Sequence, residues 1–310
     1  MRSAVKAGRN QLLYELKRDR FLYLLLAPGI VWLIVYKYLP MFGLVIAFKD
    51  FNFSKGILGS DWVGLHYFKY IFTQDVDFFN IFRNTLLISL YKLIFSFPVP
   101  IILALMLNEI VHLRFKKFLQ TSIYLPYFVS WVIFGGIIIQ FLSPQYGVVN
   151  EIIKLFGGHS VYFLAEPKYF RSIVVITEIW KNSGYATIIY LAAVTGVDPG
   201  LYEVCTLEGA NRFQKAFYVT LPCIADTIVV MLLLTVGRMM EVSFDQIFVL
   251  YTPTTYRVGD VFSTYIYRLG IGQGRFSLTT AIGLFQSAVG LILIVIANFA
   301  SRRISHRSIW

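Results

Sequence analysis

The chain alternates long apolar runs with short polar segments. Six runs are long enough to cross a bilayer core of about 30 Å, which takes roughly 20 apolar residues in a helix. They cover residues 21–47, 83–108, 119–142, 171–196, 224–246 and 278–300. Strands of a membrane barrel would instead show segments of about ten residues with alternating polarity. The pattern therefore predicts an all-α membrane protein with six transmembrane helices.

The composition supports this class. Of the 310 residues, 57% are hydrophobic and 15% are charged, whereas about a quarter of the residues of a soluble domain are charged. Backbone polar groups inside lipid must find partners within the chain, and helices meet that condition. We expect one transmembrane domain over residues 21–300, flanked by a basic tail at 1–20 and a short tail at 301–310.

The net charge of +11 is divided among the polar segments, and this division argues against a nucleic-acid surface. Basic residues gather in both tails and in the segments around Arg114 and Arg212. With six spans, all four of these segments lie on one side of the membrane. Cytoplasmic segments are enriched in Lys and Arg, so both termini are predicted to be cytoplasmic.

The segment 198–222, between the fourth and fifth spans, has a pattern of its own. Asp198 is suited to cap a helix and Pro199 to begin it. Gly209 interrupts the helical pattern, and Pro222 marks the return to the membrane. These residues predict a short amphipathic helix, a turn and a second entry into the bilayer. A helix lying on the lipid headgroups explains them equally well.

The spacing in this segment resembles the cytoplasmic loop of type I ABC importer permeases of the maltose-importer kind. That loop reads E-A-A, three residues, G, nine residues, I-x-L-P. Here Glu203-Val204-Cys205 is followed after three residues by Gly209, and after nine more by Val219-Thr220-Leu221-Pro222. The resemblance covers roughly residues 20–305 and includes four other stretches: Tyr124-Leu125-Pro126 with Ser130, Gly147 with Asn150, Phe244-Asp245-Gln246-Ile247, and Asp260 to Gly283.

The resemblance implies a coupling helix at 199–212 that seats in a separate ATPase subunit. Two copies of that ATPase would drive alternating access, and ATP and Mg would bind to them and not to this chain. A second related permease forming a heterodimer, an extracytoplasmic solute-binding protein and a bacterial cytoplasmic membrane complete the expected assembly. The residues expected to couple to the ATPase are Glu203, Glu208, Gly209, Arg212, Leu221 and Pro222.

The chain itself shows no catalytic motif. A phosphate-binding loop needs G-x-x-x-x-G-K-[ST], but the glycine-rich stretch 270–274 is followed by Arg275 and is expected to be a loop. The sequence contains no H-E-x-x-H or C-x-x-C pattern, so no metal site is predicted. We expect a non-catalytic subunit.

Ionisable residues inside the spans need a reason, because each costs about 2.5–3.5 kcal/mol on insertion scales. Lys92 is expected to reach the lipid surface or to pair with an acid. Glu178 is expected to pair along its helix with Lys181 or with Asn182, and Arg238, Glu241 and Asp245 have the spacing of one helical stripe.

Our hypothesis is that such residues converge on a translocation cavity, although bonding between helices would explain any one of them equally well. The candidates are Tyr127, Trp131, Trp180, Asn182, Tyr185, Arg238, Glu241, Asp245 and Gln286.

A sugar suits such a cavity, because amide and charged groups bind hydroxyls and aromatic faces stack on sugar rings. The family resemblance is also closest to carbohydrate permeases. The sequence therefore predicts an ATP-driven importer of a sugar or oligosaccharide. The alternative is an ion-coupled secondary transporter, in which both halves often carry broken helices. Pro98 and Pro100 break the second span, but the fifth has no equivalent pair.

Overall fold

The structure is a computed structural model that describes residues 18–305. It is built of helices, and its two strands among these residues are β1 (Lys49–Asp50) and β2 (Asp61–Trp62). The strands pair antiparallel, with Lys49 opposite Trp62. The predicted all-α membrane fold is confirmed, with up to six spans when bent helix pairs are counted as one span each.

Three spans are continuous helical stretches. The first comprises α2 (Arg20–Leu33), η1 (Ile34–Tyr38) and η2 (Leu39–Phe48). The second comprises α5 (Phe78–Tyr91), η3 (Lys92–Ser96) and α6 (Pro98–Asn108), and begins five residues before the predicted start. The last, α18 (Phe276–Ser305), continues into the predicted tail. The rest of both predicted tails, 1–17 and 306–310, lies outside the described residues.

The third span is broken, so the prediction of one helix over 119–142 is wrong. It consists of α7 (Leu113–Phe128) and α8 (Trp131–Phe141), whose axes differ by 102°. The backbone of Val129 and Ser130 is extended between them. The Ser130 hydroxyl accepts a hydrogen bond from the Ile133 amide at 3.3 Å, so it caps α8 as Ser commonly does.

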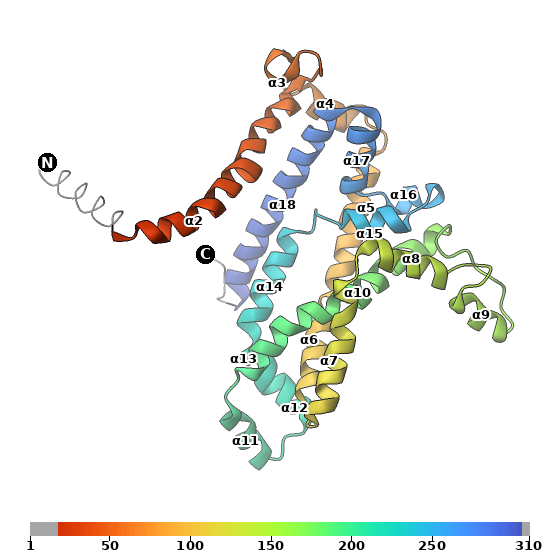
Figure 1. The fold of residues 1–310 in the computed structure, drawn as a ribbon. Helices are drawn as coiled ribbons and strands as arrows, with labels where there is room; N and C mark the ends of the chain where they lie inside the picture. The colour runs from red at the N-terminus through yellow and green to blue at the C-terminus, as the bar shows by residue number, and fades with distance from the viewer. Residues whose placement is uncertain (1–17, 306–310) are drawn as a thin grey trace, which may run out of the picture.

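The fourth span, α10 (Pro167–Thr195), is one long helix that leads into α11 (Pro199–Leu207) through a 71° bend. In Figure 1, α11 lies at the bottom of the molecule, and α3 (Gly56–Gly59) and α4 (His66–Thr73) lie at the top. The helix α10 thus connects the middle of the molecule with α11.

The fifth span begins with α12 (Arg212–Lys215), η4 (Ala216–Thr220) and α13 (Leu221–Cys223). It turns by 67° into α14 (Ala225–Gly237). The predicted helix over 224–246 is too long, because residues 238–243 are not helical and α15 (Phe244–Leu250) begins anew. Arg238, Glu241 and Asp245 therefore do not form one helical stripe, and that prediction is wrong.

The remaining elements are α9 (Val148–Leu155), η5 (Pro253–Thr255), α16 (Tyr256–Gly259) and α17 (Phe262–Gln273). Residues 270–273 form the last turn of α17, so the loop predicted at 270–274 is wrong except at its end. Gly274 ends the helix in the left-handed conformation, at φ 70°, which glycine adopts without steric cost.

Two of the three buried clusters join several spans each. One joins α4, α5, α17 and α18 around Ile71, Phe78 and Phe262, and the other joins α8, α10 and α15 around Phe134, Val174 and Ile247. The first span stands apart from both over most of its length, and Ala47 is its one fully buried residue. Figure 1 shows α2 extending away from the other helices.

Candidate functional site

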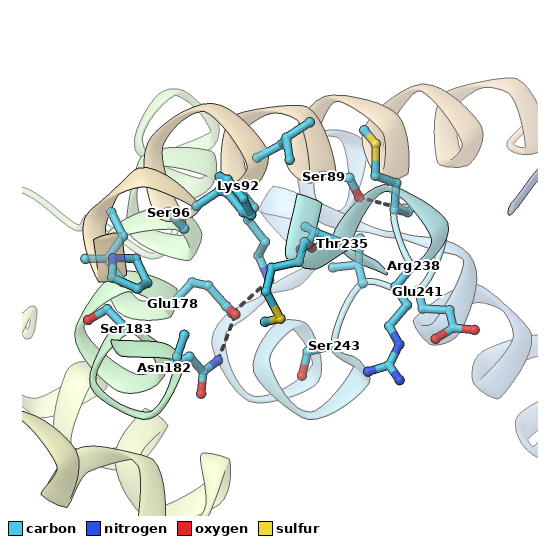
Figure 2. A pocket seen from close by; sticks show the side chains of 18 of the residues that line it. Ser89, Lys92, Ser96, Glu178, Asn182, Ser183, Thr235, Arg238, Glu241 and Ser243 are labelled. Atoms are coloured by element: carbon cyan, nitrogen blue, oxygen red, sulfur yellow. Dashed lines mark hydrogen bonds and ion pairs between the residues drawn. The ribbon is translucent and has the colours of Figure 1, made fainter. Parts of the chain in front are cut away.

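A pocket of about 360 Å³ lies between the second span, α10 and the end of α14. Part of its wall is η3, a π-helical turn in which the Phe97 amide donates to the Lys92 carbonyl at 3.1 Å. Pro98 follows directly and has no amide hydrogen to continue the ladder. Turns of this kind widen a helix and often occur at functional sites. The polar side chains lining the pocket, shown in Figure 2, are Ser89, Lys92, Ser96, Glu178, Asn182, Ser183, Thr235, Arg238, Glu241 and Ser243.

The centre of the pocket wall is an ion pair between two spans. Lys92 Nζ lies 2.9 Å from Glu178 Oε2, and the side chains are 17% and 20% exposed. Lys92 also donates to Gln246 Oε1 at 2.6 Å, and Asn182 donates to Glu178 Oε1 at 2.7 Å. The expected partner for Lys92, an acid, is present. The Glu178 carboxylate pairs with Lys92 and accepts a hydrogen bond from Asn182, so the alternative in which it pairs with Lys181 is wrong.

Arg238 and Glu241 extend from the segment after α14, on the other side of the pocket from Glu178 and Asn182 (Figure 2). Neither has an ion-pair partner among the described residues. Their charges are therefore available to a bound molecule. Ser96 contributes a hydroxyl oxygen that is buried and has no hydrogen-bond partner within residues 18–305.

Lys181 belongs to a different cluster, at the bend of the third span. It is buried, and its Nζ donates to the carbonyls of Tyr127 at 2.9 Å, Val129 at 2.6 Å and Pro126 at 3.4 Å. These carbonyls end α7, where the helix dipole favours a cation. The Tyr127 ring stacks on Tyr185 with a centroid distance of 4.1 Å. Lys181 also lies 5.4 Å from the Trp131 ring centroid. Lys181 thus stabilises the bend.

The structure divides the nine predicted path residues. Asn182, Arg238 and Glu241 line the pocket, whereas Tyr127, Trp131 and Tyr185 surround the bend. Three do neither. Trp180 packs against Phe134 at 5.2 Å, Gln286 donates to the Met240 carbonyl at 2.8 Å, and Asp245 is exposed in the first turn of α15.

Sequence reasoning did not place Lys92, Glu178 or Ser96 among the path residues. Two signals could have found them: an ionisable residue on each of two spans, and the prolines at 98 and 100 that follow Ser96. What the sequence could not show was the π-helical turn at Lys92–Ser96, which forms part of the pocket wall together with Ser96.

The segment after α10 is a short helix followed by a tight turn. Asp198 caps α11 by accepting from the Gly200 amide at 2.9 Å. The helix ends at Leu207, so the predicted range 199–212 is too long. Gly209 adopts φ +77°, and Asn211 and Gln214 form a reciprocal cap that starts the next helix. Arg212 lies 3.6 Å from Glu109.

Several apolar side chains of this segment face solvent. Leu207 is 88% exposed and Val204 is 59% exposed. Glu203, Glu208 and Pro222 are exposed as well, and Leu221 is half-buried. A mixed apolar and acidic surface at the end of a molecule is typical of a protein contact.

Comparison with known proteins finds a matching family and relatives that are similar over nearly the whole chain. The family described as the binding-protein-dependent transport system inner membrane component matches residues 96–306. The polygalacturonan/rhamnogalacturonan transport system permease protein YteP of Bacillus subtilis is 43% identical over 305 residues, which are 98% of this chain and 95% of that protein. Protein LplB of the same organism is 43% identical over 295 residues, which are 95% of this chain and 92% of LplB.

Two solved structures of ABC transporters contain chains with a similar fold. A chain of a bacterial ABC transporter involved in the import of the acidic polysaccharide alginate is similar with a TM-score of 0.88 and 44% identity. The match covers 95% of this chain and 99% of that one. A second structure shows a bacterial alginate ABC transporter with an alginate pentasaccharide-bound periplasmic protein, with a TM-score of 0.88 and 42% identity, and the match covers 96% of this chain and all of that one.

Proposed function

The chain belongs to the family of inner membrane components of binding-protein-dependent transport systems, and we propose that it carries an acidic oligosaccharide through the pocket between the second span, α10 and α14. It is a permease subunit of an ABC importer. The observation that carries the proposal is that α10 both lines this pocket and leads, through three residues, into α11. A displacement of α11 is therefore passed along one continuous helix to Glu178 and Asn182.

In this proposal, α11 is the helix through which ATP hydrolysis on a partner subunit acts on the permease. Its exposed Val204 and Leu207 would seat in a cleft of an ATPase subunit, and Glu203 and Glu208 would meet basic groups or amides there. Two ATPase copies, which bind ATP and Mg, would close and open with each cycle. Gly209 at φ +77° allows the sharp turn that returns the chain to the membrane. In the proposed orientation, α11 and both termini are on the cytoplasmic side.

A second, related permease completes the path. The pocket is bounded by one chain on only part of its circumference, and the first span leaves the body of the protein with a nearly unburied helix. An isolated apolar helix of this kind packs readily against another permease within the bilayer. A solute-binding protein would deliver the substrate at the opposite end, where α3 and α4 lie (Figure 1).

An acidic oligosaccharide fits the pocket chemistry. Sugar hydroxyls can bond to Asn182, the unpaired Ser96 and the Glu241 carboxylate. A carboxylate of the substrate can pair with the unpartnered Arg238. The relatives transport polygalacturonan or rhamnogalacturonan and alginate by name. Arg binds carboxylates with a planar fork that fixes their orientation.

The test is uptake by the assembled transporter in proteoliposomes, with the partner permease, the ATPase and the binding protein of the same system. Oligogalacturonate uptake should require ATP and the binding protein. Arg238→Gln should reduce uptake about tenfold, the effect of losing about 1.4 kcal/mol. The control, Arg302→Gln, removes an exposed charge at the end of α18 and should leave uptake unchanged. Wild-type uptake of a neutral oligosaccharide alone would contradict the proposed substrate class.

A further inference from the structure

A second pocket, of about 700 Å³, lies along the same helix nearer to the start of α10. It is lined by residues of two spans, among them Tyr91, Phe95, Arg171, Val175 and Ile179. Ile179 also lines the first pocket, so the two pockets adjoin. Since α10 ends at α11, the second pocket is the one farther from the ATPase contact.

Two cations line this second pocket and a third lies near one of them, and none has a carboxylate partner within residues 18–305. Lys168 and Arg171 line it, and Arg83 lies close enough to Arg171 to repel its charge. None of the three forms an ion pair among the described residues. Arg171 donates to Asn84 Oδ1 at 2.8 Å and to the Val258 carbonyl at 3.2 Å. Both acceptors are neutral, so they hold the guanidinium in place and leave its charge uncompensated.

The helical spacing connects this cation to the first pocket. Arg171, Val175, Glu178 and Asn182 are separated by four, three and four residues, which places them on one face of α10. A molecule moving along that face would pass Arg171 before it reached the Lys92–Glu178 pair. Tyr91 and Phe95 of the second span border the same pocket and offer ring faces.

We propose that the second pocket is an outer subsite that holds a carboxylate of the substrate before it enters the first pocket, and so selects acidic over neutral oligosaccharides. The inference rests on the proposed function and adds the residues that set its specificity. Arg171 would bind the carboxylate with two N–H groups, Lys168 and Arg83 would attract it from solution, and Tyr91 would stack on the sugar ring.

An anionic lipid headgroup offers the same charge, but the continuous stripe along α10 and the shared Ile179 favour a molecule that passes from one pocket to the next. The two occupants differ in one measurable respect. A lipid site affects the uptake of every substrate equally, whereas a carboxylate subsite affects only substrates that carry a carboxylate.

The test compares trigalacturonate with its carboxyl-reduced trisaccharide in the assembled transporter in proteoliposomes. Removing one exposed cation in Lys168→Gln should raise the KM for trigalacturonate about threefold, as for a solvent-screened ion pair. Arg171→Gln should raise it about tenfold, because a charged hydrogen bond is lost. Arg171→Lys keeps the charge without the fork and should fall between wild type and Arg171→Gln. KM for the reduced trisaccharide should be unchanged in all three variants.

Arg302→Gln, which removes an exposed cation in the last turn of α18 that does not line the pocket, is the matched control and should behave as wild type. An unchanged KM for trigalacturonate in both Lys168→Gln and Arg171→Gln would overturn the subsite while leaving the proposed function intact. Equal losses for both sugars would overturn it in favour of a lipid site. Wild-type transport of neither sugar would instead remove the proposed substrate class, and the subsite with it.

Discussion

At the scale of single residues, the Lys92–Glu178 pair joins two spans inside the lipid-embedded region. Both side chains are largely buried, and each has one further polar partner, Gln246 or Asn182. A buried pair adds little stability by itself, but removing one partner leaves a charge without compensation.

We therefore predict that Lys92→Met destabilises the protein by about 3 kcal/mol, and that Lys92→Met combined with Glu178→Gln recovers most of that loss. Thermal unfolding of the purified transporter in detergent measures both. A double variant less stable than Lys92→Met would show that the pair does not act as a unit.

Lys181 acts differently, because its partners are backbone carbonyls. Its three hydrogen bonds satisfy the end of α7 at the break in the third span. Lys181→Met should cost about 2 kcal/mol, the value of hydrogen bonds to a charged group. Lys154→Met, an exposed lysine on α9, should cost little. Equal unfolding temperatures for the two variants would contradict the role assigned to Lys181.

At the scale of elements, the packing of α10 against α7 depends on one glycine. A Cβ at Gly184 would lie 2.1 Å from the Ile123 carbonyl oxygen, and a backbone atom cannot move aside as a side chain would. Gly184→Ala should therefore separate the two helices and lower the unfolding temperature. Gly136→Ala in α8 is the matched control, because a Cβ there meets nothing within 4 Å. A similar loss in both variants would show that helix propensity, and not contact, sets the result.

The elements also show what the sequence could predict. Apolar run length located all six spans, and Asp198 with Pro199 located the start of α11. Run length could not detect the bend after Phe128, because the residues on both sides of it are mostly apolar. It could not detect the end of α14 at Gly237 either, because Arg238 and Glu241 have helical spacing and Met239 and Met240 between them are apolar. The bends depend on contacts from other spans, such as Lys181 on the carbonyls of α7. For the same reason, the stripe inferred for Arg238, Glu241 and Asp245 assumed a helix that the fold does not continue.

At the scale of the whole molecule, α10, α11 and the turn at Gly209 form one mechanical connection. Val at position 209 would be strained, since a β-branched residue at φ +77° is a conformational outlier. We predict that Gly209→Val lowers uptake much more than it lowers membrane insertion of the protein. Gly157→Val, also at positive φ but in the segment after α9, is the control and should leave ATP coupling intact. Equal effects of the two changes on uptake per assembled transporter would contradict a specific role for Gly209.

In the proposed mechanism, ATP hydrolysis on a partner subunit acts through α11 and drives transport by this chain. The most direct measurement is uptake of labelled trigalacturonate into proteoliposomes containing the assembled transporter, with the binding protein outside and ATP inside, in the presence of ionophores that abolish ion gradients. We expect uptake that requires ATP and persists with the ionophores. Uptake that continues without ATP and stops when the ion gradients are abolished would contradict it.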